Sequence, residues 1–320
     1  MNRLHTLQCT SLLLIPAIWE VMCLQRIPGA GMLLGAAGAY LFSLALLLPL
    51  LTGAEIFRMK WVRLVFAGYF LLTGARNLAQ LSDTAPAELL AVPGRWGAGF
   101  LLVLTCLYTA AMGLPAAARS APVILGVFLL GMLLLAGSAW RQIDVRQLQW
   151  DGLPEGMGLF FLSTELPALW VLRGRLEGSA VKTAALITLG KTLVLGGIGF
   201  LCVTAGGVLM QHSDAPFFTL CALSQPLQGQ RADALYILMF VMFCVMELTL
   251  QAGLCAHLLG ETFAACRKTA PVVLLLMLGL SAVLSRATLD ALCAMLMPVL
   301  AFGLPCAILM LRTLRRRSRA

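Results

Sequence analysis

Apolar runs long enough to cross a bilayer recur from one end of this chain to the other. A membrane-spanning helix needs about 20 mostly apolar residues, and the 320 residues are 60% hydrophobic and only 12% charged. A soluble domain carries about 25% charged residues, and the apolar runs leave no stretch long enough for such a domain. The sequence therefore predicts an all-α polytopic membrane protein, with residues 1–320 forming a single transmembrane domain.

We predict ten transmembrane helices with both termini in the cytoplasm. Basic residues gather in alternate connections and in the tail 312–320, and cytoplasmic loops of membrane proteins carry the excess of Lys and Arg. This orientation places most of the basic residues, including the tail, on the cytoplasmic side. The predicted spans are residues 7–24, 31–52, 61–81, 96–117, 122–140, 157–170, 180–210, 232–259, 271–285 and 291–311.

The sixth span, MGLFFLSTELPALW, differs from the others because polar residues and a proline lie in its middle: Ser163, Thr164, Glu165 and Pro167. A proline inside a helix removes a backbone hydrogen bond and crowds the preceding turn. Freed backbone groups and a carboxylate are tolerated in a bilayer only where they face a cavity or other protein. Discontinuous helices of this kind build the binding sites of secondary transporters. We therefore expect the span to open near Pro167.

The two halves of the chain correspond weakly in layout. The first span combines Pro16 with Glu20, and the sixth combines Glu165 with Pro167. Residues 1–140 and 156–311 then form two sets of five spans. This arrangement is that of the LeuT-like 5+5 inverted repeat, in which helices 1 and 6 are broken.

Five ionisable side chains fall inside the predicted spans, where each costs at least about 2.5–3.5 kcal/mol at a helix centre. We predict a midplane site at which carboxylates bind an ammonium group or a proton and an arginine holds a carboxylate. Ser163 and Thr164 either contact the ligand or cap the opened turn. The five ionisable residues are Glu20, Arg76, Glu165, Lys191 and Glu247, with Glu165, Glu20 and Arg76 assigned to binding or coupling.

The alternative for the same side chains is structural pairing. Arg76 can be bonded to Glu165 or Glu247, which would lock the bundle. Glu20 and Lys191 can lie near span ends and extend to the interface. We assign Glu247 and Lys191 as possible structural charge partners.

The sequence offers little to an enzyme, a metal or a nucleic acid. The ten cysteines form no CxxC pair and no His–Cys cluster, and no metalloprotease, nucleophile-elbow or phosphate-loop motif occurs in context. The net charge of +9 gathers at membrane flanks, as a topology signal does. We expect no catalysis, no metal, no cofactor and no nucleic-acid partner.

Three segments carry a resemblance to a known family. The first comprises residues 64–76, LVFAGYFLLTGAR, with residues 96–128, which include CLYTAAMGLPAAARSAPVILGVF. The second is residues 158–169, GLFFLSTELPAL, and the third is residues 215–254, which contain QRADAL at 230–235. In this order they resemble the spore germination permeases of the GerAB type, within the amino acid–polyamine–organocation transporters.

The resemblance implies a ten-span subunit of a germinant receptor in the inner membrane of a bacterial spore. Such a subunit acts with a larger membrane subunit and a lipoprotein, and binds a small nutrient, typically an amino acid, where spans 1 and 6 meet. Two alternatives stay open. One is a proton-coupled amino-acid or polyamine transporter with Glu165 as the coupling group. The other is a non-transporting membrane scaffold in which the charges are structural.

Overall fold

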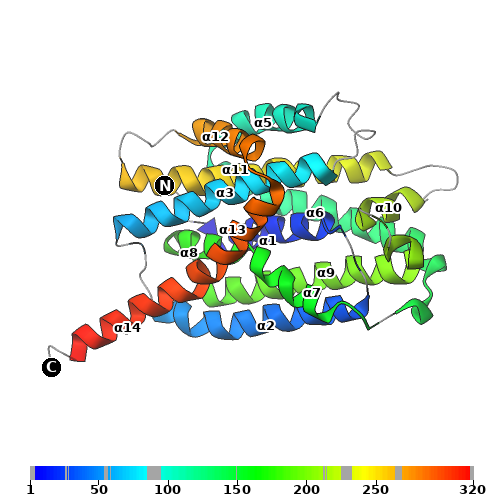
Figure 1. The fold of residues 1–320 in the computed structure, drawn as a ribbon, viewed down its shortest axis with the longest axis horizontal. Helices are drawn as coiled ribbons and strands as arrows, with labels where there is room; N and C mark the ends of the chain where they lie inside the picture. Colours follow the sequence, from blue (N-terminus) through cyan, green and yellow to red (C-terminus); the bar gives the residue numbers. More distant parts are fainter. Residues whose placement is uncertain are drawn as a thin grey trace.

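The computed structural model describes residues 4–25, 27, 29–53, 57, 59–84, 95–148, 150–211, 213, 215–224, 233–263 and 269–317. Most of the polar connection between spans 3 and 4, the first half of the QRADAL segment and the last three residues of the basic tail lie outside these ranges. The described part is a bundle of helices (Figure 1) with one short parallel pairing, in which β1 (Leu4–His5) meets β2 (Leu176–Glu177).

The helices follow the predicted apolar runs in order. They are α1 (Thr6–Met22), α2 (Ala30–Gly53), α3 (Lys60–Thr84), α5 (Arg95–Met112), α6 (Leu114–Ala139), α7 (Leu153–Gly158), α8 (Glu165–Leu172), α9 (Ala180–Gln211), α10 (Pro216–Leu223), α11 (Asp233–Thr262), α12 (Ala270–Val283), α13 (Arg286–Pro298) and α14 (Leu304–Arg317). A short π-helical segment, Val299–Gly303, joins the last two.

Within the described residues, five helical segments are long and apolar enough to cross a membrane. Three further apolar helices are shorter: Thr6–Met22, Phe100–Met112 and Ala270–Val283. The chain is a helical membrane protein, as predicted, while the full set of ten spans stays a prediction. The five long segments are Ala30–Leu51, Leu114–Gln142, Ala180–Gly207, Leu235–Thr262 and Arg286–Leu311.

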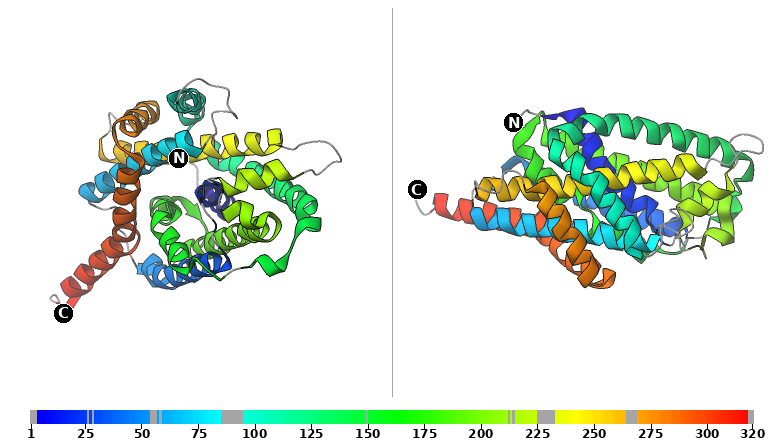
Figure 2. Two further views of the ribbon diagram at one scale, coloured as in Figure 1. Left: turned by 45° about the vertical axis from the view of Figure 1, so that its right-hand side comes forward. Right: turned by 90° about the horizontal axis from the view of Figure 1, so that it is seen from above.

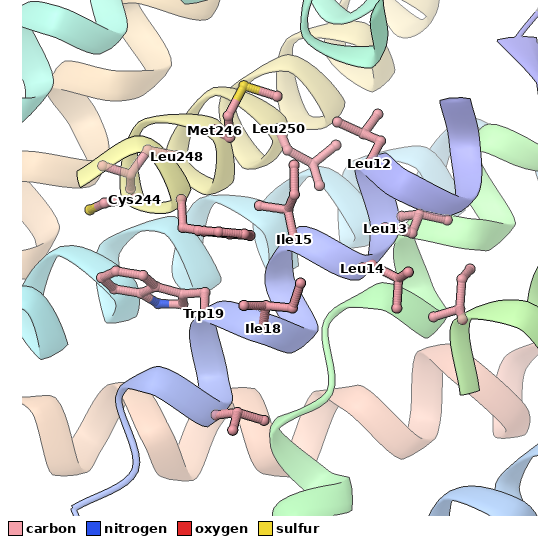
Figure 3. Close-up of a cluster of buried hydrophobic side chains, with 14 of the residues drawn as sticks. Leu12, Leu13, Leu14, Ile15, Ile18, Trp19, Cys244, Met246, Leu248 and Leu250 are labelled. Carbon is pink, nitrogen blue, oxygen red and sulfur yellow. The ribbon is translucent and has the colours of Figure 1, made fainter. Parts of the chain in front are cut away.

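The helix α1 lies in the interior of the bundle (Figure 2), and 13 of its 17 residues are buried. It packs against α6, α8, α9 and α11. Figure 3 shows Ile15 and Trp19 of α1 among the side chains of α11, and Trp19 also stacks on Phe240 with ring centroids 4.7 Å apart. A helix that is apolar all round is buried all round. By contrast, only 22% of the most apolar window of Leu114–Gln142 is buried, so most side chains of α6 lie on the outside of the bundle.

The sixth span is interrupted, but not at its proline. A 3₁₀ turn, Leu159–Leu162, follows α7, the backbone is extended at Ser163 (φ −65°, ψ 112°), and α8 begins at Glu165. Pro167 is the third residue of α8, where a backbone N–H has no partner within the helix in any case. The predicted cause of the interruption is therefore wrong, because the proline costs no hydrogen bond at this position.

Two further boundaries differ from prediction. The helix α1 is continuous with Pro16 inside it, so the break predicted in the first span is not observed. The fourth and fifth spans are separated at Gly113, whose φ of 81° lies in the left-handed region that glycine adopts without strain. Pro122, expected at the start of the fifth span, lies inside α6.

Glycines bring α2 and α7 together backbone against backbone. A Cβ atom added at Gly156 would collide with the carbonyl oxygen of Met32, and one added at Gly35 would collide with that of Leu153. These obstacles are main-chain atoms, which cannot rotate away as a side chain can. The close approach fixes the position of α7 before the interruption of the sixth span.

We expect Gly156→Ala to lower the melting temperature of the protein in detergent, because overpacking a tight contact costs about 1–3 kcal/mol. Gly158→Ala is the matched control on the same helix, since its added Cβ atom has no atom within 4 Å. Alanine is favoured over glycine in a helix by up to about 1 kcal/mol, so the control should be neutral or stabilising. Equal melting temperatures for the two variants would contradict the close contact.

Candidate functional site

Charged side chains of alternating sign form a connected series through the described part of the interior, here named the charge chain. It draws on α8, α9, α1, α3 and α13, which lie far apart in the sequence. Each member is an ion-pair neighbour of the next. In order, the members are Glu165, Lys191, Glu20, Arg76, Asp290 and Arg286.

Lys191 is the centre of the buried end of the charge chain. Its Nζ atom donates to Oε1 of Glu165, Oε2 of Glu20 and Oγ of Ser163, each at 2.8 Å. An ammonium group has three donor protons, so these contacts use all of them. The same nitrogen lies 4.6 Å from the ring centroid of Tyr40, within the range of a cation–π contact. Lys191 thereby fastens α1 and the start of α8 to α9.

The other end of the charge chain leads toward the surface. Arg76 lies 3.8 Å from Oε1 of Glu20 and 3.7 Å from Oδ1 of Asp290. Arg286 lies 3.5 Å from the second oxygen of Asp290. The exposed fraction of the side chain rises from 2% at Arg76 to 36% at Asp290. Three carboxylates and three cations balance along this path from the interior to the start of α13.

Two buried polar atoms at the start of α8 have no hydrogen-bond partner within the described residues: Oγ1 of Thr164 and Oε2 of Glu165. Thr164 stands at the N-cap position, yet its side chain makes no capping hydrogen bond. Buried polar atoms are almost always satisfied by protein or by water. The described protein atoms therefore leave the polar groups at the start of α8 partly unsatisfied.

A cavity of about 100 Å³ adjoins the middle of the charge chain. The polar side chains in its lining are those of Glu20, Gln25, Tyr40, Arg76, Gln80 and Arg286. Sites for drug-sized ligands occupy about 300–1,000 Å³, so this cavity suits a solute of only a few heavy atoms. Arginine binds carboxylates with charge-assisted hydrogen bonds, and a glutamate can bind an ammonium group. A glutamate beside two arginines therefore suits a small molecule that carries both a carboxylate and an ammonium group.

The structure brings most of the predicted site residues together. Glu165, Ser163, Glu20 and Arg76 all belong to the charge chain or contact it directly, and Thr164 adjoins them. Two structural alternatives from the sequence are wrong in detail. Lys191 is only 1% exposed and does not extend to the interface, because two carboxylates neutralise it inside the protein.

The partners of Arg76 also differ from prediction. Its ion pairs are with Glu20 and Asp290 rather than with Glu165 or Glu247. Glu247 takes part in no salt bridge within the described residues and accepts hydrogen bonds from Asn77 and Gln251 instead. Its predicted role as a charge partner is therefore not supported by its contacts.

Sequence reasoning missed several members of the site: Asp290, Arg286, Tyr40 and Gln80. Residues 286–290 were expected to form only a brief link between spans 9 and 10, whereas they form the first turn of α13. One available signal was the spacing of Arg286 and Asp290, because residues four apart on a helix face each other. The other signal was the ring hydroxyl of Tyr40 in the largely apolar run 31–52.

No protein-family model matches the chain, and no curated protein matches it. The geometry defines the class by itself: a helical membrane protein with a balanced charge chain beside a small cavity that is lined by both apolar and charged side chains. Among the described residues, no group of three or more His, Cys, Asp or Glu side chains is placed to hold a metal ion.

We expect Lys191→Met to lower the melting temperature strongly, because removing one partner of a buried ion pair costs about 3–5 kcal/mol. Lys182→Met is the matched control, since Lys182 is exposed near the start of the same helix. A thermal denaturation series in detergent measures both. Equal small shifts for the two variants would mean that Lys191 holds nothing together.

The double variant Lys191→Met, Glu165→Gln should be more stable than the sum of the two single changes predicts. It removes one buried negative charge together with its cation, and residues in one ion-pair network typically couple by about 0.5–3 kcal/mol. A double-mutant cycle of melting free energies gives the coupling. Strict additivity would show that the 2.8 Å contact between these groups contributes nothing to stability.

Proposed function

We propose that the chain is a permease-like membrane subunit of the spore germinant receptor type. It binds a small nutrient that carries both an ammonium and a carboxylate group, most simply an amino acid, in the cavity beside the charge chain. The observation that carries this proposal is the lining of that cavity, where Glu20 faces the same space as Arg76 and Arg286. The resemblance of residues 158–169 and 215–254 to the germination permeases supplies the physiological setting.

The packing of the helices supports a LeuT-like arrangement of ten spans. In a 5+5 repeat, α1 corresponds to α8, α2 to α9, α3 to α11 and α5 to α12, and each of these pairs is in contact. Transporters built from inverted repeats place their site at the interface of the repeats, beside discontinuous helices. The charge chain joins α1 and α3 of the first half to α8, α9 and α13 of the second.

The proposed mechanism is competition between the solute and the charge chain. A ligand carboxylate drawn to Arg76 and Arg286 weakens their hold on Glu20 and Asp290, and a ligand ammonium offers Glu20 an alternative to Lys191. A ligand shifts a conformational equilibrium only through its different affinity for the two states. Loosening the contact of α1 with α9 supplies that difference. The change then passes to the larger membrane subunit and the lipoprotein in the spore inner membrane, with both termini of this chain in the cytoplasm.

We expect small amino acids to raise the melting temperature of the full-length protein in nanodiscs. A ligand that binds only the folded state stabilises by about 2.7 kcal/mol at 100 times its Kd. Leu159→Trp should abolish this rise by filling the cavity that Leu159 lines, while leaving the charge chain intact. Leu153→Trp, at an exposed position of α7, is the matched control and should preserve the rise.

Analogues that lack one charge sharpen the result. A simple carboxylate or a simple amine should stabilise less than the amino acid that combines both groups. Two results together would replace the proposal with the scaffold alternative. No amino acid would stabilise the wild type, and Glu165→Gln would fold normally and change neither ligand binding nor flux.

Flux into liposomes separates the two transport-related functions. Binding without flux, together with co-purification of the larger membrane subunit and the lipoprotein, supports the receptor. Solute flux that follows a proton gradient and collapses on Glu165→Gln would instead make the chain a proton-coupled transporter.

A further inference from the structure

Glu247 stands apart from the charge chain. It lies midway along α11, about 20 Å from either end at 1.5 Å per residue, and it is only 1% exposed. No salt bridge reaches its carboxyl group within the part of the chain that the structure describes, whereas each carboxylate of the charge chain has a cation. The negative charge of a carboxyl group in this position must be neutralised by something other than a salt bridge.

Neutral amides surround one oxygen of Glu247. Oε1 accepts hydrogen bonds from Nδ2 of Asn77 on α3 and from Nε2 of Gln251 on its own helix, both at 2.8 Å. Oε1 of Gln251 in turn accepts from the hydroxyl of Thr73 at 3.0 Å. The carboxyl group is therefore held in a fixed orientation between α3 and α11.

The remaining oxygen atoms of the same two groups are both unsatisfied. Oε2 of Glu247 and Oδ1 of Asn77 are buried and have no hydrogen-bond partner among the described residues. Each of these atoms is an acceptor when the carboxyl group is ionised, so neither can satisfy the other in that state. The hydrogen bond from Nδ2 of Asn77 to Oε1 of Glu247 already joins these two groups. Oε2 is the other oxygen of that carboxyl group, and Oδ1 is the oxygen of that amide.

A single proton resolves both deficits. When Oε2 carries a proton it becomes a donor, and Oδ1 of Asn77 is an unsatisfied acceptor on the amide that already donates to the other oxygen of the same carboxyl group. The same proton removes the negative charge, and an unpaired charge in an apolar interior is far more costly than a neutral hydrogen-bonded group. Both the hydrogen bonding and the electrostatics favour the neutral acid.

Other charges nearby do not supply a counter-ion to Glu247. Among the charged groups that act on it from neighbouring helices are Glu20 on α1 and Arg76 on α3, and Cys244 lies on its own helix. Glu20 and Arg76 are 3.8 Å apart and offset each other. This ion pair therefore supplies no net positive charge to neutralise Glu247.

We propose that Glu247 is a proton-binding site, separate from the solute cavity and located between α3 and α11. The proton comes from water and returns to water, and its binding replaces the carboxylate with a neutral acid bonded to Asn77. Asn77 directly follows Arg76 on α3. Loss of the proton therefore changes the hydrogen bonding of a residue next to Arg76, a member of the charge chain. This inference goes beyond the proposed nutrient binding and does not depend on it.

Infrared spectroscopy of the full-length protein in lipid at neutral pH tests the proposal. The difference between wild type and Glu247→Gln should contain the carbonyl band of a protonated carboxylic acid, shifted in D₂O. Asn77→Ala should keep this band but move it to higher frequency, because the acid loses its hydrogen-bond acceptor. Glutamine resembles the neutral acid in shape and charge, so Glu247→Gln should fold normally.

Glu261→Gln is the matched control on the same helix. Its side chain is 42% exposed, 3.1 Å from His257 and 3.8 Å from Arg63, so its difference spectrum should show the loss of carboxylate bands and no carbonyl band of a protonated acid. Carboxylate bands without an acid band in the Glu247→Gln difference would overturn the proposal. A carboxylate band at Glu247 that depends on sodium would overturn it too, because a metal cation would then neutralise the site.

Discussion

Charge balance inside the hydrocarbon region is the constraint on which the rest of this structure depends. Each buried charge costs at least about 2.5–3.5 kcal/mol by itself, and the attraction between opposite charges is stronger there than in water. Alternation of sign from Glu165 to Arg286 offsets these costs in series. Because the members come from five different helices, the same balance fixes how those helices are placed. Apolar packing against lipid, which is as apolar as leucine, cannot specify that placement.

The interruption of the sixth span follows from the same requirement. On a continuous helix, residues 163 and 165 would point about 200° apart at 3.6 residues per turn. Both nevertheless reach the ammonium group of Lys191 at 2.8 Å. The extended backbone at Ser163 turns its hydroxyl toward Lys191, while Glu165 begins the new helix. The break thus exists to converge two side chains on one cation, and Pro167 merely tolerates the first turn that results.

Local features of this fold could be predicted from sequence, whereas the pairing of side chains between distant helices could not. Apolar runs marked the helices because the bilayer sets their length, and polar residues inside one run marked the interruption. The boundary at Gly113 was missed because a single positive φ leaves no compositional trace beside Pro115 and Pro122. The pairing of Lys191 with Glu20, 171 residues away, depends on tertiary packing. Ionisable residues could be recognised as costly, but spacing along the chain does not show which of them meet.

The interior contains two kinds of carboxyl group, one paired with a cation and one hydrogen-bonded to neutral amides. The two kinds have different roles. Glu165 faces the ammonium group of Lys191, which also holds Ser163 and Glu20, so its charge is part of the framework. Glu247 faces amides, which can serve a neutral acid but cannot cancel a charge. A framework charge must persist for the fold to persist, whereas a group without a counter-ion can change its state. Since α3 carries both Arg76 and Asn77, a member of the charge chain and the hydrogen-bond partner of Glu247 are neighbours on one helix, and a change at either site can reach the other.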